Sequence, residues 1–540
     1  RSMQRQRVQR RLTTEPALAT VLADTSPCDS DGEEIELHLY SDSSETRALV
    51  EHGRTEVAKD GTVWREEQLA KPLLFTPVEP YTADGAPTAN TRRIVTSRLQ
   101  SFLCFISLEM LHVIQQCTVQ HARHTEQQDW FMDVPELMAF IAILIWKGVC
   151  RVPALSDNWS AEMGYPRIIS TMSRNRFQSI MQHLRFDDMF TCGERGETDQ
   201  FAPISTVWEH FVKNCISAFT PGRHITVDEQ LFPTKARCRF LQYIATKPDK
   251  FGIKFWVACD LKSKSICNAI PYLGKDPSRP NGERLSESVV MKLMEPFMDQ
   301  GRTVTTDNFF TSLSLAQRLR SRRTSILGTV NKIRREISPS TRQSDQIAFT
   351  TQVFSTPEAT LTVYAPKPKK TVYILSSMHS QVETEDTNKR KPNTVTQYNK
   401  TKCGVDVMDQ MVRKYTERRA QFLVELAKEL AKSHINAKES RKENKLRQQP
   451  LTPSPGKRGK CQVLHGCAGN SAPGRCVHCY KYTCGKCKKV PALECLPCSD
   501  SPDRPRKRKQ VCGFPIFCIL HDKNNKTDIP KHQYFCLFCF

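Results

Sequence analysis

The sequence predicts an α/β protein of several domains, and three observations support this prediction. Strand and helix patterns alternate over residues 221–333, apolar residues recur at helical spacing over 96–220, and eight cysteines lie within residues 461–498. Alternating strands and helices predict a sheet covered by helices, because each element must bury its apolar side against another element. The length of 540 residues suits roughly two to four domains.

Composition favours a nucleic-acid partner. The net charge is +22 and the isoelectric point is near 9.2. Such an excess attracts a polyanion in a salt-dependent way, although charge alone leaves a basic ribosomal or nuclear protein open. The longest apolar run, residues 137–146, is shorter than a membrane span requires. The first residues show no signal-peptide pattern, so we expect an intracellular protein whose 22 cysteines are thiols or metal ligands rather than disulfides.

Two segments precede the alternating region. Residues 1–95 combine a basic start, an acidic stretch at 29–45 and a Pro/Thr/Ala linker. Few apolar residues recur there at any period, so we expect a disordered tail. The acidic stretch is either a solvated tail or a phosphorylated interaction segment. Residues 96–220 predict a helical domain, in which a helix over 133–149 begins with an Asp cap and a Pro in its first turn.

Within residues 221–333 the expected order is three strands, a helix, a strand, a helix and a last strand. The run IKFWVA is apolar throughout, which predicts a strand buried on both faces. We therefore expect Phe255 and Trp256 to lie in the core rather than to stack on bases.

Two regions follow the alternating one. Residues 334–397 interrupt its pattern with a predicted β-hairpin over 359–378 around a Pro/Lys turn. Residues 398–447 are expected to lead from a loop into helices.

Four aspartates carry the catalytic signal. Asp228 and Asp307 each follow a β-branched run, and Asp406 and Asp409 are spaced i, i+3 in a predicted helix, so both can face one side. Hard divalent cations prefer oxygen ligands. Two such ions about 3.5–4 Å apart can activate a water and stabilise the leaving oxygen of a phosphodiester. The alternative is structural, because strand-end aspartates are common turn residues and acidic pairs complement a helix N-terminus.

Seven co-linear segments carry a resemblance to a known family. They are LSDNWS (155–160), RNRFQSIMQHLRFDD (174–188), PGRHITVDEQLFP (221–233), KPDKFGIKFWVACD (247–260), TVTTDNFFTSLSLAQRL (303–319), GTVNKIRREI (328–337) and YNKTKCGVDVMDQM (398–411). With them the chain resembles the piggyBac family of DNA transposases, in particular the transposable-element-derived proteins of the vertebrate type 4 subgroup. The similarity runs from residue 99 to 414 and resumes weakly in the Cys-rich end.

The resemblance implies an α/β fold with an RNase H-like catalytic domain and an aspartate triad. The triad carries over to Asp228, Asp307 and Asp406, which would hold two Mg²⁺ ions, with Asp409 a neighbouring acidic residue of the same motif. The implied reaction is cut-and-paste transposition into TTAA sites.

The resemblance also implies domains and partners. The catalytic domain would comprise residues 221–333 and 398–447, with 334–397 as a β-rich insertion. Residues 96–220 would form an N-terminal domain that dimerises or binds DNA. The expected partners are double-stranded DNA, as transposon ends and TTAA target, and a second copy of the chain, with no membrane partner.

The chain departs from the family at three places. Ala236 and Cys403 stand where relatives have Gly, and after Ala420 a stretch of about thirty residues looks deleted. Its loss is expected to expose apolar surface and to loosen Asp406, and positioning errors of about 1 Å can cost 10²-fold in rate. A catalytically inactive, transposon-derived nuclear protein that binds DNA or chromatin is therefore the alternative function.

Basic residues near the aspartates are candidates for phosphate contacts, with a generic solvated charge as the alternative for each. They are Lys332, Arg334, Arg335, Lys400 and Lys402. Glu229 and Asn308 adjoin the carboxylates and are expected to orient them or the metal-bound waters.

The cysteine-rich region, residues 448–500, predicts a zinc-binding domain. Its eight thiols are Cys461, Cys467, Cys476, Cys479, Cys484, Cys487, Cys495 and Cys498. Three CxxC pairs suit two tetrahedral Zn²⁺ sites, with disulfides or free thiols as the alternative. In the family such a domain is a cross-brace that binds transposon-end DNA. That pattern implies one ion on Cys461, Cys467, Cys484 and Cys487 and the second on the other four cysteines.

Other features of this region keep alternatives open. His465 or His478 could replace a cysteine, and a RING-like protein-binding role is also open. Within residues 501–540, the basic run at 502–509 predicts a nuclear localisation signal or a DNA-binding tail. The apolar end at 511–540 is either a third zinc site on its four cysteines or sequence without a coding origin.

Overall fold

The computed structural model describes most of the chain between residues 54 and 495. It leaves out Leu74, 126–127, 152–153, 161, 163, 235–237, 246, 248, 275–278, 281, 343–346, 448–458, 464–466, 468–470, 478, 480 and 490–493. The described residues group into two compact units. Among the described residues, the first unit contains 54–81, His224–Thr226 and Phe297–Cys403, and the second contains Thr82–Arg223, Val227–Pro296 and 404–495.

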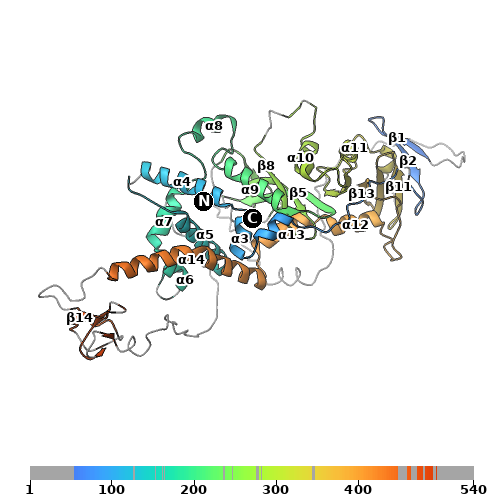
Figure 1. The fold of residues 1–540 in the computed structure, drawn as a ribbon. Helices are drawn as coiled ribbons and strands as arrows, with labels where there is room; N and C mark the ends of the chain where they lie inside the picture. The colour runs from blue at the N-terminus through green and yellow to red at the C-terminus, as the bar shows by residue number, and fades with distance from the viewer. Residues whose placement is uncertain are drawn as a thin grey trace, which may run out of the picture. The chain divides into compact units, whose positions relative to one another are not determined.

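The first unit is built on one β-sheet with the strand order β1-β2-β11-β12-β13-β10-β9, followed by the first residues of β5 (Figure 1). Its elements are β1 (Thr55–Val57), β2 (Val63–Glu67), β9 (Thr303–Thr306), α11 (Leu313–Ser321), β10 (Ser325–Thr329), η3 (Pro339–Arg342), β11 (Thr351–Ser355), β12 (Thr360–Lys367), β13 (Lys370–Ser376) and α12 (Asn393–Thr401).

Strand direction in this sheet follows from the connections. β9 and β10 pair in parallel, with α11 as the crossover that parallel neighbours need. β10, β13, β12, β11 and β2 then pair antiparallel in turn. The predicted hairpin over 359–378 is confirmed as β12 and β13, and Lys369 takes a left-handed conformation (φ 64°) in its turn. Helix α12 packs on β10 and β13 over buried Leu327, Ile374 and Tyr398.

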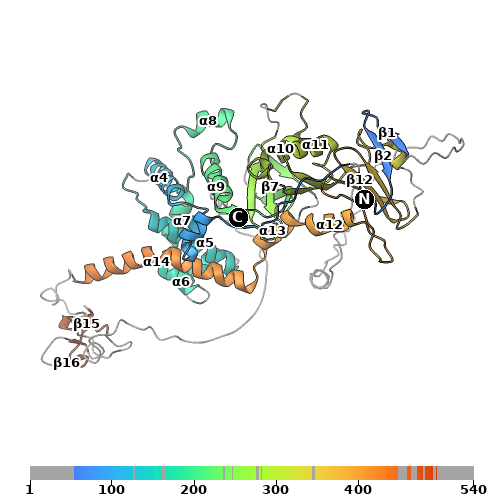
Figure 2. The same cartoon turned by 45° about the vertical axis from the view of Figure 1, so that its right-hand side comes forward.

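The N-terminal segment differs from its expectation. Residues 1–53 lie outside the described residues, but 54–81 join the first sheet rather than forming a disordered tail, with β1 and β2 at its edge (Figure 2). Trp64 is fully buried, and its indole N–H donates a 2.7 Å hydrogen bond to the carbonyl of Glu336. Burying one large aromatic side chain and pairing two strands stabilises the segment without any periodic apolar pattern.

The helical part of the second unit surrounds one apolar core. Its elements are β3 (Ala86–Pro87), α2 (Ala89–Ile94), α3 (Arg98–Leu103), α4 (Leu108–Thr125), α5 (Val134–Cys150), η1 (Ser156–Trp159), α6 (Pro166–Thr171), α7 (Arg174–His183), α8 (Cys192–Thr198), α9 (Ser205–Ala218) and β4 (Phe219–Thr220). The predicted cap of α5 is confirmed, because the Asp133 carboxylate accepts the N–H of Glu136 at 2.8 Å. Helix α3 ends at Leu103, and α4 begins after Ser107, whose hydroxyl accepts the N–H of Met110.

The sheet of the second unit has the strand order β5-β7-β6, with β8 paired to β7. Its elements are β5 (His224–Pro233), β6 (Leu241–Tyr243), β7 (Phe251–Asp260), β8 (Ile266–Pro271), α10 (Leu285–Met294), η2 (Glu295–Phe297), α13 (Gly404–Arg413) and α14 (Glu417–Arg447). β7 and β8 form a hairpin, and Phe255 and Trp256 are buried as expected. Helix α10 ends at Met294 because Pro296 cannot continue an α-helix.

The last two helices, α13 and α14, pack on earlier elements of the second unit. α13 packs on β7, and the long helix α14 lies along α5 (Figure 1). The loop expected before the third aspartate is partly helical, since α12 occupies Asn393–Thr401. The described part of the cysteine-rich region has β14 (Gly474–Arg475) paired to β15 (Tyr482–Thr483), and β16 (Lys488–Lys489) paired to β17 (Glu494–Cys495). Among the described residues, no helix combines the length and hydrophobicity of a membrane span.

Candidate active site and cysteine cluster

A hydrogen bond joins the strand of Asp228 to the helix of Asp406. The side-chain amide of Gln230 on β5 donates to Oδ1 of Asp409 on α13 at 3.1 Å. Residues two apart share a face of a strand, and residues three apart share a face of a helix. Asp228 and Asp406 therefore lie on the two faces that this hydrogen bond brings together.

Lys247 supplies a cation at these faces. Its Nζ lies 3.5 Å from Oδ1 of Asp406, and its side chain is 23% exposed. Burial would lower the pKa of this ammonium, but the charges of Asp406, Asp228 and Glu229 outweigh that effect and raise the pKa. A positive group thus already lies against one predicted metal ligand and feels the charge of another, and such oxygen donors suit a hard cation.

Asp409 links α13 to β5 in the same unit. Its Oδ2 accepts a 2.9 Å hydrogen bond from Nε of Arg413 one turn later, while its Oδ1 accepts the bond from Gln230. Arg413 also pairs with Asp249. Asp409 thereby fixes α13 against β5 and against the segment that carries Lys247.

Asp307 lies in the first unit, directly after β9, whose neighbour in the strand order is β5. Its Oδ1 accepts the N–H groups of Phe309 (3.0 Å) and Phe310 (3.4 Å), and its carbonyl accepts the Thr311 hydroxyl at 2.6 Å. Asp307 therefore stabilises a turn, which was the structural alternative left open by the sequence. These bonds also orient the carboxylate at the end of the strand.

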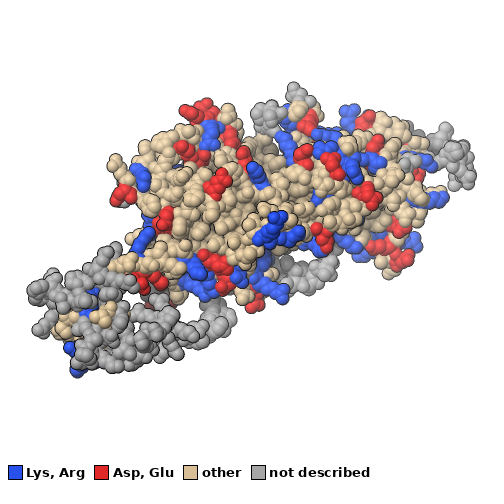
Figure 3. All heavy atoms as spheres, viewed as in Figure 1, with Lys and Arg blue, Asp and Glu red and all other residues tan. Residues whose placement is uncertain are grey.

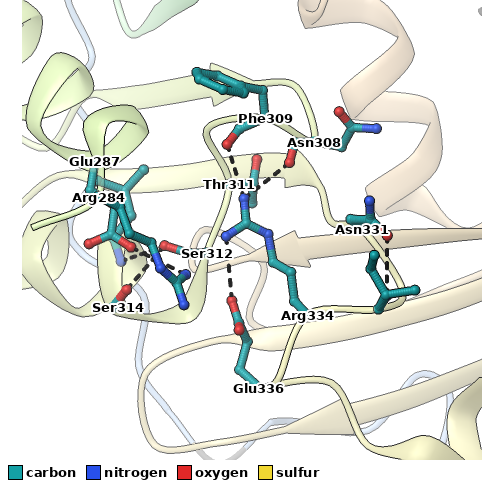
Figure 4. A network of polar contacts seen from close by, with 12 residues as sticks. Arg284, Glu287, Asn308, Phe309, Thr311, Ser312, Ser314, Asn331, Arg334 and Glu336 are labelled. Atoms are coloured by element: carbon teal, nitrogen blue, oxygen red, sulfur yellow. Dashed lines mark hydrogen bonds and ion pairs between the residues drawn. The ribbon is translucent and has the colours of Figure 1, made fainter. Parts of the chain in front are cut away.

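Arg334 holds the loop that follows Asp307 (Figure 4). One guanidinium nitrogen donates to the carbonyls of Asn308 (3.1 Å) and Phe309 (3.0 Å), and the other lies 3.9 Å from the buried carboxylate of Glu336. The side chain of Arg334 is only 16% exposed. Its guanidinium therefore contacts protein, where the sequence suggested a phosphate contact.

The other predicted phosphate contacts are more exposed to solvent than Arg334 or only half-buried. Lys332, Arg335 and Lys400 are exposed. Lys402 is half-buried, with its Nζ 5.8 Å from the centre of the Tyr398 ring. Exposed cations of this kind are available to a polyanion, whereas the Arg334 guanidinium already contacts protein carbonyls.

Glu229, expected to orient a metal ligand, pairs with Lys254 on β7. The Lys254 ammonium lies 3.9 Å from the centre of the buried Trp256 ring. This cation–π contact fixes Lys254 and, through it, the carboxylate next to Asp228.

An open apolar pocket of about 360 Å³ lies where α13 leads into α14. Its lining includes Phe105, Phe211, Met408, Met411 and Phe422. Phe422 is 43% exposed and lies two residues after Ala420, where the sequence comparison predicts a deletion. Apolar surface is thus open at this junction, as the shortened sequence predicts.

Four cysteines form the cluster that the cross-brace pattern implied for one ion. The Sγ atoms of Cys461, Cys467, Cys484 and Cys487 all lie within 4.8 Å of one another, and Cys467 is 3.7 Å from Cys484 and 3.6 Å from Cys487. Zn–S bonds of about 2.3 Å in a tetrahedron place sulfurs about 3.8 Å apart. Burial would raise the pKa of Cys461, but hydrogen bonds from backbone and neighbouring thiols lower it to about 7. The geometry therefore suits a zinc ion.

The remaining predictions for this region are only partly visible. Cys476 is buried and Cys479 half-buried. Several predicted features lie outside the described residues. They are the side chains of Cys495 and Cys498, both histidines considered as ligands, the basic run at 502–509, the end at 511–540 and Ala236.

Sequence reasoning missed the roles of Lys247, Gln230 and Arg413. The first stands in the quoted segment KPDKFGIKFWVACD and the second in PGRHITVDEQLFP, but no local pattern distinguishes them. Their contacts join residues up to 182 positions apart. Only the fold brings them to the aspartates.

Comparison with known proteins gives consistent matches. The family model described as transposase IS4 matches residues 98–432. The human PiggyBac transposable element-derived protein 3 is 23% identical over 414 residues, covering 67% of this chain and 69% of that protein. The human chimeric ERCC6-PGBD3 protein is also 23% identical over 414 residues, and 38% of it is covered.

A solved structure shares the fold. The cryo-EM structure of a piggyBac transposase synaptic complex with hairpin DNA is similar with a TM-score of 0.64 and 27% identity, over 77% of this chain and 100% of that one. The family model spans more than half of the chain. The mixed α/β chain therefore belongs to the piggyBac-type transposase IS4 family.

Proposed function

We propose that this protein is a Mg²⁺-dependent cut-and-paste DNA transposase with an RNase H-like catalytic domain and TTAA target sites. Asp228, Asp307 and Asp406 hold two Mg²⁺ ions in this proposal. One observation carries the proposal: the Gln230–Asp409 hydrogen bond joins the strand of Asp228 to the helix of Asp406, where Asp406 already pairs with the Lys247 ammonium. When bound, the ions activate a water and stabilise the leaving oxygen of the phosphodiester.

The chain's own residues orient the ligands. Gln230 and Arg413 hold Asp409, which fixes the helix of Asp406 against β5. Arg334 fixes the loop after Asp307 by its hydrogen bonds to the carbonyls of Asn308 and Phe309. Such bonds make the carboxylates rigid before any ion or DNA binds, which limits the reorganisation that cleavage requires.

The DNA partner follows from the matched structure and from charge. The solved relative is a transposase synaptic complex with hairpin DNA, and we propose that this chain likewise binds double-stranded transposon ends, as a homodimer. On the face shown in Figure 3, Lys and Arg side chains are interspersed with Asp and Glu. Exposed Lys332, Arg335 and Lys400 are the proposed phosphate contacts.

The cysteine-rich domain has a supporting role in this proposal. Cys461, Cys467, Cys484 and Cys487 hold a structural Zn²⁺. Cys476, Cys479, Cys495 and Cys498 hold a second one. The folded module binds transposon-end DNA, and the basic run at 502–509 directs the protein to the nucleus.

Excision from a donor plasmid that carries the element's own ends tests the function. Asp307→Asn removes a proposed metal ligand and is expected to abolish excision. Asp60→Asn, at an exposed turn where Asp60 accepts the N–H of Thr62, is the matched control and should excise normally. Excision by Asp307→Asn at the wild-type level would refute the proposal.

A second function is favoured by one observation. The open pocket at the α13–α14 junction places apolar surface beside the helix of Asp406. If α13 is loosened there, the protein is a transposon-derived DNA-binding protein without catalytic activity. Specific DNA binding together with the same absence of excision in wild type and Asp307→Asn would favour this function.

A further inference from the structure

We infer that Lys247 is the internal counter-ion of the Asp228–Asp406 pair and competes with the divalent cation for these carboxylates. The inference deepens the proposed function and rests on its assignment of both aspartates as metal ligands. In the metal-free protein the ammonium offsets one of the two negative charges of these acids. It must withdraw when a divalent cation binds.

The position of the ammonium is the first argument. Nζ of Lys247 is 3.5 Å from Oδ1 of Asp406. The Gln230–Asp409 hydrogen bond turns the face of β5 that carries Asp228 toward the face of α13 that carries Asp406. Lys247 thus contacts Asp406 on the helix that this hydrogen bond joins to the strand of Asp228.

The neighbouring charges are the second argument. Lys254 pairs with Glu229 and lies over the Trp256 ring. Arg413 is held by Asp409 and Asp249. Both cations are engaged by other groups, whereas the Lys247 ammonium lies 3.5 Å from Asp406.

The attachment of the segment is the third argument. The short segment between β6 and β7 that carries Lys247 is held on α13 at two points, by Lys247 on Asp406 and by Asp249 on Arg413. Loss of the first contact leaves the second in place. The ammonium can therefore leave Asp406 while Asp249 keeps the segment attached to α13.

A purely structural role predicts something different. If Lys247 only tethers its segment to α13, then removing either tether should lower stability and leave cation affinity unchanged. Lys247→Met removes the charge with little change in length. Asp249→Asn removes the second tether of the same segment and keeps the Lys247 ammonium, so it is the matched control.

Mn²⁺ binding to the full-length, zinc-loaded protein without DNA, measured by electron paramagnetic resonance, tests the inference. The double variant Asp228→Asn/Asp406→Asn defines the signal of the proposed site. Lys247→Met is expected to bind Mn²⁺ roughly threefold or more tightly than wild type, because a competing charge within 4 Å is removed. Lys247→Arg and Asp249→Asn should stay close to wild type, and thermal unfolding followed by circular dichroism confirms that each variant is folded.

The outcomes separate this inference from the proposed function. Tighter Mn²⁺ binding by Lys247→Met, with unchanged binding by Asp249→Asn, supports the counter-ion. Unchanged or weaker binding by Lys247→Met, while the double aspartate variant loses binding, overturns the counter-ion and leaves the metal site standing. Wild-type binding that does not depend on the two aspartates overturns both.

Discussion

The side-chain amide of Gln230 donates a hydrogen bond to Asp409 and joins β5 to α13. These residues lie 179 positions apart in the chain. The bond matters because each partner is next to a proposed metal ligand on its own element, Asp228 on the strand and Asp406 on the helix. Anything that breaks it should act on stability and on the metal site together.

Gln230→Leu should therefore lower the free energy of unfolding by about 1 kcal/mol, the usual net value of one hydrogen bond. Asp409 keeps its bond to Arg413, so the protein should remain folded. Chemical unfolding measures the change. Gln242→Leu on β6 is the control, because the amide of Gln242 makes only long bonds (3.4 Å) to nearby carbonyls. Equal destabilisation by both variants would contradict the role given to Gln230.

Arg334→Gln should reduce excision roughly ten- to a hundredfold without weakening DNA binding. The variant loses the guanidinium that holds the carbonyls of Asn308 and Phe309, so the loop after Asp307 loosens. Fluorescence anisotropy across a salt series separates this role from a phosphate contact.

The comparison variants for Arg334 are its exposed neighbours. Lys332→Gln and Arg335→Gln should each reduce the slope of log affinity against log salt by about 0.9, the value for one released phosphate contact. Arg334→Gln should leave the slope unchanged. A slope reduced by Arg334→Gln, with normal excision of bound DNA, would show that Arg334 contacts phosphate after all.

Cys484→Ala should remove one of the two zinc ions expected in the full-length protein. Three remaining thiols cannot complete the tetrahedral site, and the fold of a small zinc module depends on its metal. Metal analysis by mass spectrometry should give a fall from two ions to one, together with loss of binding to transposon-end DNA. Zinc content and DNA binding that both match wild type would rule out the cluster as a metal site.

Gly328→Ala should destabilise the protein by about 1–3 kcal/mol. A Cβ at this position would lie 2.2 Å from the Thr311 hydroxyl and 2.6 Å from the Thr306 carbonyl, both in the region that carries Asp307. Gly196→Ala in α8 is the control. There a Cβ meets nothing within 4 Å, and the change should stabilise the helix by about 0.5–1 kcal/mol. Differential scanning calorimetry measures both changes. A shift of the melting temperature in the same direction for the two variants would contradict the close packing described around Gly328.

Local chemistry explains which parts of the fold were predictable. The start of α5 follows from Asp133 and the Pro beside it, because a cap and a first-turn proline act within four residues. The β7–β8 hairpin follows from apolar runs around a short turn. The four clustered cysteines follow from the resemblance and from the preference of zinc for paired thiolates.

Long-range contacts explain what the sequence could not reveal. Trp64 orders residues 54–81 through burial against a region more than 250 positions away, which no local pattern records. Arg334 is of a residue type that often contacts phosphate, yet in the fold its guanidinium donates to the carbonyl of Asn308 in the loop after Asp307. Lys247 becomes significant only when β5 and α13 are brought together.

The most direct test is to locate Mn²⁺ by anomalous scattering in crystals of the full-length protein grown with the ion. The account predicts Mn²⁺ peaks shared by carboxylate oxygens of Asp228, Asp307 and Asp406, at bond lengths of about 2.0–2.6 Å. It also predicts that Nζ of Lys247 has moved away from Asp406. Ordered aspartates with no shared peak, or a peak bound by other residues alone, would contradict the metal site.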